Sequence, residues 1–293
     1  MQGKMILIGI LLAALCALLP LTARADDTLT VWHEGKMTRM SREAYLIGVV
    51  AAEMPASYEM EALKAQAVAA RTRTMRRCRA HPGADVCTDS ACCQGYLTDE
   101  AQRARWGLET EMYRARVKEA VDATRGIVIT YGDEPIEVLY HAVSGGYTED
   151  AEQVFREALP YLRSVASPGE EGAPGFETTQ TFAQDTLIAV FPDEKPPIRV
   201  EVTGRSNSGR VTAVRVGAHT MTGRLFRSAL GLKSTIFELE SIGDTLVIRQ
   251  RGYGHGVGMS QAGANAMAKT GSTFAEILLH YYTGVALSLL AEQ

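Results

Sequence analysis

Residues 41–74 read SREAYLIGVVAAEMPASYEMEALKAQAVAARTRT, and this stretch decides how the chain folds. Apolar side chains recur at helical spacing over residues 45–50, after Ser41, a residue type that caps helix N-termini. Pro55 ends this first helix, because a proline disfavours α geometry in the residue before it. A second helix is predicted over about residues 59–78, and its many alanines allow neighbouring elements to pack very closely against it.

The rest of the chain mixes helices with hairpins. Hairpins are predicted over residues 127–141 and 198–217, around turn sequences rich in Gly, Asp, Asn and Ser. The regular βαβ alternation of a parallel sheet is missing from this pattern. We therefore predict an α+β fold, with helices and antiparallel hairpins around one intertwined core over residues 26–293 and an inserted β-rich region at about residues 198–250.

Composition excludes several classes of protein. The 293 residues are 46% hydrophobic and 22% charged, which is enough apolar material for a substantial core and too much for a disordered chain. The 27 glycines and 10 prolines are too few for a collagen-like fibre. Lysine and arginine number 30 against 34 aspartates and glutamates, so nucleic acid is not an expected partner.

The N-terminus carries the one long apolar segment. Residues 5–22 have no charge, with Lys4 before them and Arg24 after, and Ala23-Arg24-Ala25 fits an A-x-A cleavage site. Residues 1–25 are therefore predicted to be a signal peptide or, if uncleaved, a membrane anchor. Either interpretation puts the remainder outside the cytoplasm, secreted or anchored to the membrane.

Four cysteines crowd into one short stretch, at Cys78, Cys87, Cys92 and Cys93. In an oxidising compartment one or two disulfides are the first interpretation. The alternative is a metal site formed by Cys87, Cys92 and Cys93, with His81 as a further candidate ligand.

Glu53 is the first candidate for chemistry, because it lies in the last turn of the first predicted helix. The residues before it are apolar, and burial together with the negative end of the helix dipole raises the pKa of a carboxyl group there. Such a carboxyl suits general-acid catalysis near neutral pH, whereas a solvated helix-terminal glutamate is the alternative. Arg71 lies among alanines and needs an anion, which is either a structural ion-pair partner or a bound substrate.

Two further segments are candidates for lining a cleft. In residues 252–261, GYGHGVGMSQ, the glycines let the main chain approach another surface, and a tight turn is the alternative role. We expect this loop and residues 53–71 to form opposite walls of one cleft. In residues 141–148, HAVSGGYT, the histidine follows a predicted strand and is either structural or catalytic. No phosphate-binding loop, serine-hydrolase elbow or HExxH motif occurs in the sequence.

Six segments together resemble the stage II sporulation protein D family, which also includes amidase enhancers of bacterial cell walls. They are YLIGVVAAEMP, EALKAQAVAARTRT, the C-x4-CCQGY stretch, HAVSGGYTED, LPYLRSV and GYGHGVGMSQAGANAMA. The resemblance implies a lytic transglycosylase that cleaves peptidoglycan glycan strands during the engulfment stage of sporulation, with Glu53 as catalytic acid. Some members bind zinc through C-x4-H-C-Q. Here Cys87 and Cys93 match the cysteines and Cys92 replaces the histidine, so zinc and a disulfide both remain open.

The residues are compatible with that reaction. Hydrolytic glycosidases use two carboxylates, and only Glu53 is well placed here. In a lytic transglycosylase the 6-hydroxyl of the muramic acid attacks its own anomeric carbon, so one acid/base group is enough and no cofactor is required. We predict that six side chains bind the sugar: Arg71, His141, Ser144, His255, Ser260 and Gln261.

The resemblance also implies partners. These are the glycan strands themselves, a cell-wall amidase and membrane-scaffold proteins of sporulation, together with the membrane if the N-terminal segment is retained. The alternative function is a non-catalytic wall-binding module that stimulates a partner amidase, which would need no acid with a raised pKa.

Overall fold

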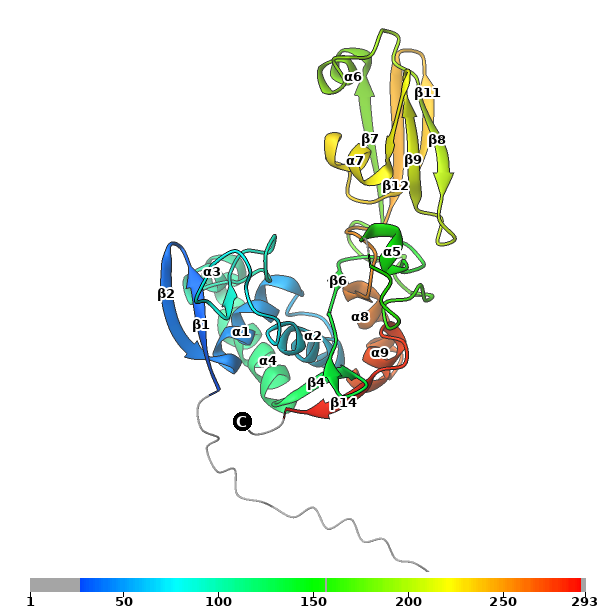
Figure 1. Ribbon diagram of the computed structural model, residues 1–293. Helices are drawn as coiled ribbons and strands as arrows, with labels where there is room; N and C mark the ends of the chain where they lie inside the picture. Colours follow the sequence, from blue (N-terminus) through cyan, green and yellow to red (C-terminus); the bar gives the residue numbers. More distant parts are fainter. Residues whose placement is uncertain (1–26, 156, 291–293) are drawn as a thin grey trace, which may run out of the picture.

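A computed structural model describes residues 27–155 and 157–290 (Figure 1). Helices and mostly antiparallel strands are interspersed along the chain, so the predicted α+β class is confirmed. The helices are α1 (Arg42–Glu53), α2 (Met60–Arg73), α3 (Asp99–Trp106), the 3-10 helix η1 (Gly107–Glu109), α4 (Thr110–Ala123), α5 (Ala151–Val154), α6 (Gln184–Val190), α7 (Gly223–Ala229), α8 (Gln261–Lys269) and α9 (Phe274–Tyr281). The strands are β1 (Thr28–His33), β2 (Lys36–Ser41), β3 (Val86–Cys87), β4 (Ile127–Tyr131), β5 (Glu134–Pro135), β6 (Tyr140–His141), β7 (Glu177–Ala183), β8 (Val200–Arg205), β9 (Val211–Val216), β10 (His219–Thr222), β11 (Ile236–Ile242), β12 (Thr245–Arg251), β13 (Met259–Ser260) and β14 (Ala286–Leu289).

Helix α2 is the centre of the larger body. From Ala62 to Thr72 every residue except Lys64 is buried, because α1, α4, α8, α9 and β4 all pack around the helix. The alanines make this close packing feasible, as the sequence indicates. Helix α1 begins as predicted, with the Ser41 hydroxyl accepting the Ala44 N–H, whereas α2 ends at Arg73, earlier than expected.

The predicted hairpin over residues 127–141 is only partly formed. Strand β4 pairs with β5 over two residue pairs and with β14 along its other edge. The second strand ends at Pro135, although the Ile136 N–H still donates to the Ile129 carbonyl over 3.1 Å. The chain resumes as β6, which pairs in parallel with β13 at the start of α8. Residues separated by more than a hundred positions thereby meet beside the helical body.

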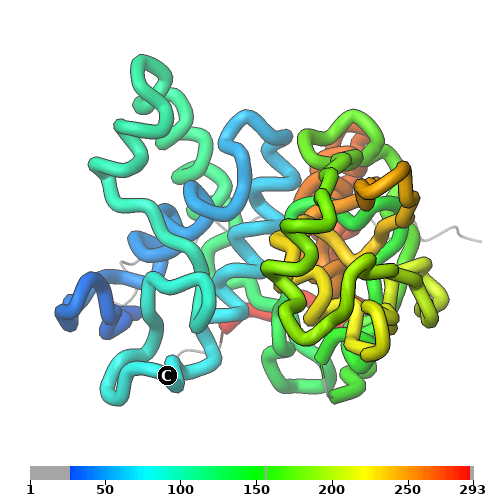
Figure 2. The backbone as a smooth tube through the Cα atoms, turned by 90° about the horizontal axis from the view of Figure 1, so that it is seen from above, coloured from blue at the N-terminus to red at the C-terminus, as the bar shows by residue number. Residues whose placement is uncertain are grey.

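Residues of β7 through β12 form a second unit with its own core. Two antiparallel three-stranded sheets, β11-β12-β7 and β10-β9-β8, and the helices α6 and α7 enclose a cluster of buried apolar side chains. Its strands extend from Glu177 to Arg251, and the division of the chain into domains stays a prediction. In Figure 1 this unit stands above α5, and Figure 2 shows the segments coloured blue and cyan on the side away from it.

The predicted signal peptide or anchor, residues 1–25, lies outside the described residues. Within the described ranges, no helix is long and apolar enough to cross a membrane.

Candidate active site

Glu53 is the last residue of α1, and its side chain is half-buried. The main-chain N–H of Gly95 donates to Glu53 Oε1 over 2.7 Å. Burial raises the pKa of the Glu53 carboxyl, while the Gly95 N–H and the Tyr140 hydroxyl act in the opposite direction. The net shift is upward, so this carboxyl holds its proton to a higher pH than an exposed glutamate does.

An arginine from α3 reaches the C-terminal end of α1 beside this carboxyl. Arg105 donates through Nη1 to the carbonyls of Ala51 and Ala52, at 2.8 and 3.3 Å. These carbonyls carry the negative end of the helix dipole, and the positive guanidinium offsets it. The dipole, which the sequence suggested as a cause of the raised pKa of Glu53, is therefore weakened. Burial is the main cause.

Tyr140 and Gln94 complete the surroundings of the acid. The Tyr140 hydroxyl donates to Gln94 Oε1 over 2.9 Å and lies beside the Glu53 carboxyl, where it lowers the pKa of that carboxyl. Burial raises the pKa of Tyr140 well above its ordinary value, so the phenol stays protonated and remains a donor. Among the described residues, none of the hydrogen bonds to the Glu53 carboxylate comes from a second carboxyl group.

The four cysteines converge directly before Gln94 and Gly95. Their sulfur atoms all lie within 4.8 Å of one another, with Cys78 Sγ 3.5 Å from Cys92 Sγ and Cys92 Sγ 3.8 Å from Cys93 Sγ. These separations exceed a disulfide bond, and all four thiols are free. A tetrahedral zinc ion with Zn–S bonds of about 2.3 Å needs sulfurs about 3.8 Å apart, so the four thiolates fit zinc.

Cys78 joins the three predicted ligands, and His81 does not. The His81 ring instead stacks on Trp32, with ring centroids 4.8 Å apart. Cys93 directly precedes Gln94 and Gly95, so the cluster adjoins the loop that donates to Glu53.

Tyr96, the next residue, rests on α1. A Cβ added to Gly48 would lie 2.2 Å from the Tyr96 ring, so only a glycine in α1 lets the ring pack there. The Leu97 N–H also donates to the Gly48 carbonyl over 3.0 Å. The loop that follows the cysteines is thus held against the same helix that ends in Glu53.

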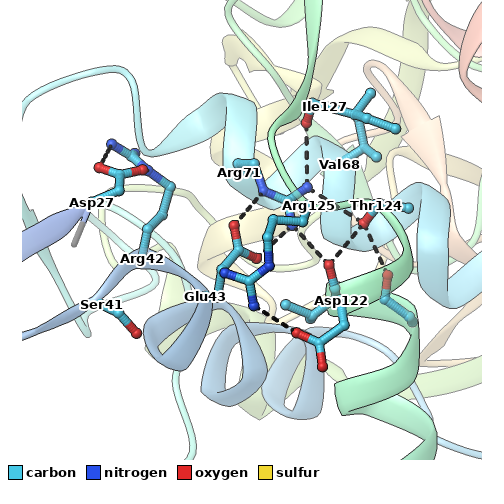
Figure 3. A network of polar contacts seen from close by, with 12 residues as sticks. Asp27, Ser41, Arg42, Glu43, Val68, Arg71, Asp122, Thr124, Arg125 and Ile127 are labelled. Carbon is cyan, nitrogen blue, oxygen red and sulfur yellow. Dashed lines mark hydrogen bonds and ion pairs between the residues drawn. The ribbon is translucent and has the colours of Figure 1, made fainter. Parts of the chain in front are cut away.

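Arg71 forms the structural ion pair that the sequence left open as the alternative to sugar binding. Its side chain is fully buried (0% exposed) and forms a bidentate ion pair with Glu43 (Figure 3). Nε donates to Oε1 over 3.0 Å and Nη2 donates to Oε2 over 2.7 Å. Its remaining hydrogen bonds go to the carbonyls of Val121 and Ile127 and to the Thr124 hydroxyl. The guanidinium is satisfied inside the protein, so Arg71 fastens α1, α2 and α4 together.

Four of the other predicted sugar-binding side chains are also buried in internal networks: His141, Ser144, Ser260 and Gln261. The hydroxyl of Ser144 lies 2.8 Å from His141 Nε2, and Ser260 donates to Glu170. Gln261 Nε2 lies 3.3 Å from Gln66 Oε1. These polar groups hydrogen-bond within the protein and hold β6, β13 and α8 together, and their predicted role in sugar binding stays a prediction.

Glu170 is the centre of this network and was missed in the sequence. Its carboxylate accepts from the main-chain nitrogens of Ser144, Gly145 and Gly146 and from the hydroxyls of Ser167 and Ser260. Five donors balance one buried negative charge. The glutamate therefore secures the turn of the HAVSGGYT segment.

His255 is half-buried, and its ring nitrogens are engaged by main chain. Nδ1 accepts from the Val257 N–H over 3.1 Å, and the ring also hydrogen-bonds the main chain of Tyr140. Burial, followed by the positive charges of Arg210 and Arg227, lowers the pKa of His255 to about 4, so the ring is neutral at ordinary pH. Its predicted role as a sugar donor stays a prediction, and Nδ1 is already occupied by the Val257 N–H.

The glycine loop contacts residues 53–71, because Gln261 Nε2 lies 3.3 Å from Gln66 Oε1, and a shared cleft between them stays a prediction. His255 lines a pocket whose described residues do not include Glu53. Tyr140 joins the two regions, because its main chain contacts His255 and its phenol contacts Glu53. The signal for Gln94 and Gly95 was present in the CCQGY stretch, but no pattern in the sequence marked Tyr140.

Comparison with known proteins identifies the family. A family model described as Stage II sporulation protein matches residues 33–131, the range that holds Glu53, the cysteines and Gly95. The chain is 39% identical over 254 residues to Stage II sporulation protein D of Bacillus subtilis (strain 168), covering 84% of this chain and 74% of that protein. It is 38% identical over 260 residues to the protein of the same name in Bacillus amyloliquefaciens, with the same coverage. The chain belongs to the Stage II sporulation protein D family, and the predicted family is confirmed.

A more distant relative has a different name. The chain is 28% identical over 301 residues to the Amidase enhancer of Bacillus subtilis (strain 168), covering 83% of this chain and 40% of that protein.

Proposed function

We propose that this protein is a lytic transglycosylase that cleaves peptidoglycan glycan strands to 1,6-anhydromuramyl products in sporulation. The observation that carries the proposal is the half-buried Glu53 carboxyl, whose pKa is raised and which accepts from the Gly95 N–H beside the Tyr140 hydroxyl. A general acid needs a pKa near the working pH, and burial supplies that shift. Membership of the sporulation family supports the substrate.

The reaction needs only one acid/base group. Protonated Glu53 gives its proton to the glycosidic oxygen as the bond to the anomeric carbon breaks. The Glu53 carboxylate then takes the proton of the muramic acid 6-hydroxyl while that oxygen bonds to the same anomeric carbon. Glu53 ends the reaction protonated, as it began, so no water molecule is needed. The nucleophile belongs to the substrate itself, and its high effective concentration accelerates the attack. The Gly95 N–H and the Tyr140 hydroxyl stabilise the charged carboxylate between the two steps.

The alternative is a non-catalytic module that stimulates a partner amidase. The likeness to the Amidase enhancer favours it, at lower identity and over 40% of that protein. Such a module has no use for a buried carboxyl with a raised pKa, because burying an ionisable group costs stability. The environment of Glu53 therefore supports the enzyme.

Incubation of the purified protein alone with peptide-free glycan strands separates these functions. The enzyme releases short saccharides, and Glu53→Gln does not. If the wild-type protein leaves the strands intact but accelerates an added cell-wall amidase, the enhancer function holds and the enzyme proposal fails.

We also propose zinc at the four cysteines. Four thiolates with sulfurs within 4.8 Å suit a closed, structural site, in which every coordination position is filled by protein. Zinc would supply stability to the loop before Gln94 and would not enter the reaction. Metal analysis of protein purified without added zinc should find one zinc per chain. Protein that is instead metal-free and has lost four free thiols would support disulfides.

For location and partners, we propose an extracytoplasmic protein, secreted or anchored through residues 1–25. An amidase of the cell wall and membrane-scaffold proteins of sporulation are its proposed partners. Cell fractionation of a tagged full chain, with and without residues 1–25, tests the location.

A further inference from the structure

A pocket of about 120 Å³ lies where the β-rich unit meets the loops of the helical body. Helix α5 and the glycine loop form one side, and the start of β9 and helix α7 form the other. In Figure 1 the label of α5 marks this junction, at the base of the β-rich unit. Three arginines line the pocket: Arg210, Arg224 and Arg227.

Arg210 is the most enclosed of the three, at 2% exposure. Nη2 donates to the Ser144 carbonyl over 2.8 Å, while Nε is buried without a hydrogen-bond partner. A Cβ on Gly256 would lie 2.1 Å from the Arg210 Cζ, so only glycine lets the loop cover the guanidinium. Burial lowers the pKa of Arg210 to about 10, which leaves it charged at neutral pH.

No carboxylate within the described ranges lies at ion-pairing distance from Arg210, Arg224 or Arg227. Glu149 also lines the pocket, but its carboxylate accepts from the hydroxyls of Ser206 and Ser208 and from the Asp150 N–H. The carboxylates of Glu149 and Glu170 both act on Arg210, so the three positive charges at the pocket exceed two negative charges. His255 adds none, because it is neutral there. A buried guanidinium with an unused donor favours an anion.

We propose that this pocket binds a carboxylate group of the peptidoglycan strand, through the guanidinium groups of Arg210 and Arg227. The proposal rests on the proposed function, since it names the chemistry of the same substrate. Peptidoglycan has two kinds of carboxylate. One is the lactyl carboxylate of muramic acid, which is free when no stem peptide is attached, and the other belongs to the stem peptides.

The pocket is connected to the acid through one residue. The His255 ring contacts the main chain of Tyr140, and the Tyr140 phenol contacts the Glu53 carboxylate. A glycan strand carries carboxylates at regular intervals, so a carboxylate held at the pocket would set which bond of the strand lies at Glu53. Anchoring of this kind orients a flexible substrate before the reaction.

Binding by calorimetry to the full chain carrying Glu53→Gln tests the proposal without turnover. The probes are peptide-free strands, strands with stem peptides, and each of these with its carboxyl groups converted to methylamides. We expect a carboxylate strand to bind about tenfold more tightly than its methylamide, a difference of about 1.4 kcal/mol. The strand type whose affinity falls on blocking identifies the source of the carboxylate.

Substitutions of the pocket arginines test whether the preference for carboxylate strands arises in the pocket. Arg227→Gln and the more exposed Arg224→Gln, each combined with Glu53→Gln, should reduce the preference for carboxylate strands and leave the affinity for methylamide strands unchanged. Arg215→Gln is the matched control, because Arg215 is exposed on β9, pairs with Glu201 and does not line the pocket. Equal affinity for carboxylate and methylamide strands of both types overturns the proposal, as does a preference that survives Arg227→Gln.

These outcomes are independent of catalysis. If the wild-type protein cleaves strands but shows no carboxylate preference, only the pocket proposal fails. If Glu53→Gln binds carboxylate strands selectively but the wild-type protein cleaves none, only the proposed function fails.

Discussion

The main-chain nitrogen of Gly95 donates a 2.7 Å hydrogen bond to Oε1 of Glu53. A Cβ on residue 95 would lie 3.1 Å from the same oxygen, so a side chain there would crowd the carboxylate. Gly95 follows Cys93 by two residues, and the four cysteine sulfurs gather within 4.8 Å. The proposed catalytic acid therefore accepts its main-chain hydrogen bond from a loop that directly follows the cysteine cluster.

Replacement of Glu53 should separate activity from stability. Glu53→Gln keeps an oxygen for the Gly95 N–H but cannot transfer a proton, so strand cleavage should fall by about 10²–10⁴-fold. Because folding raises the pKa of Glu53, its contribution to stability is present at low pH and is lost as the pH rises through the folded-state pKa. In urea unfolding, the variant should gain stability over the wild-type protein from about pH 4 to about pH 8. A stability difference that does not change with pH would contradict the raised pKa.

Tyr140→Phe should move the pH profile of cleavage. The lost hydroxyl stabilises the charged form of Glu53, so its removal raises the pKa of the carboxyl further. The first step needs protonated Glu53, and the fall in activity on the alkaline side should shift to higher pH. Tyr282→Phe is the control, since its buried hydroxyl donates to the Leu139 carbonyl over 2.9 Å and not to Glu53. An unchanged profile in Tyr140→Phe, or the same shift in both variants, would be inconsistent with this role.

Cys78→Ser tests the fourth ligand that the structure adds to the cluster. With three thiolates left, zinc content should fall below one per chain and the melting temperature should drop. A chelator should lower the melting temperature of the wild-type protein and change the variant little. His81→Ala is the control, because its ring stacks on Trp32 outside the cluster and its loss should leave zinc bound. Full zinc content in Cys78→Ser would remove Cys78 from the site.

Arg71→Met should act on stability and not on substrate affinity. It leaves Glu43, which is only 14% exposed, without its partner, and breaking a buried pair in this way costs about 3–5 kcal/mol. Arg125→Met breaks the exposed pair with Asp122 and should cost less than about 1 kcal/mol. Urea unfolding measures both, and KM for glycan strands is measured on the folded fraction. A raised KM with normal stability in Arg71→Met would instead support Arg71 as a sugar ligand.

The local structure of residues 41–74 could be predicted from the sequence because its signals are local. Ser41 caps α1, Pro55 follows its end, and the alanines mark the buried helix α2. The shortening of the second strand in the predicted hairpin could not be predicted from the sequence. The chain after it pairs as β6 with β13, which lies more than a hundred residues away. Long-range pairing of that kind leaves no periodicity in either segment.

The candidate site was predictable in part for a related reason. Glu53 stands out by its position in an apolar helix, and CCQGY is a compact motif. Arg71 looked equally suited to an ion pair or a ligand, and only the tertiary structure shows its ion pair with Glu43. The sequence around Tyr140 does not predict its place in the site. Its phenol contacts Glu53 and its main chain contacts His255, and both come from distant segments.

The most direct test is strand cleavage in oxygen-18 water, with the products analysed by mass spectrometry. It shows whether the nucleophile is a water molecule or the 6-hydroxyl of the strand itself. In the proposed reaction the 6-hydroxyl closes the ring, so the products are 1,6-anhydro sugars without the label, and Glu53→Gln yields almost none. Products that carry one labelled oxygen at the new reducing end would mean that water attacks the anomeric carbon, which would contradict the single-acid account and require a second catalytic group.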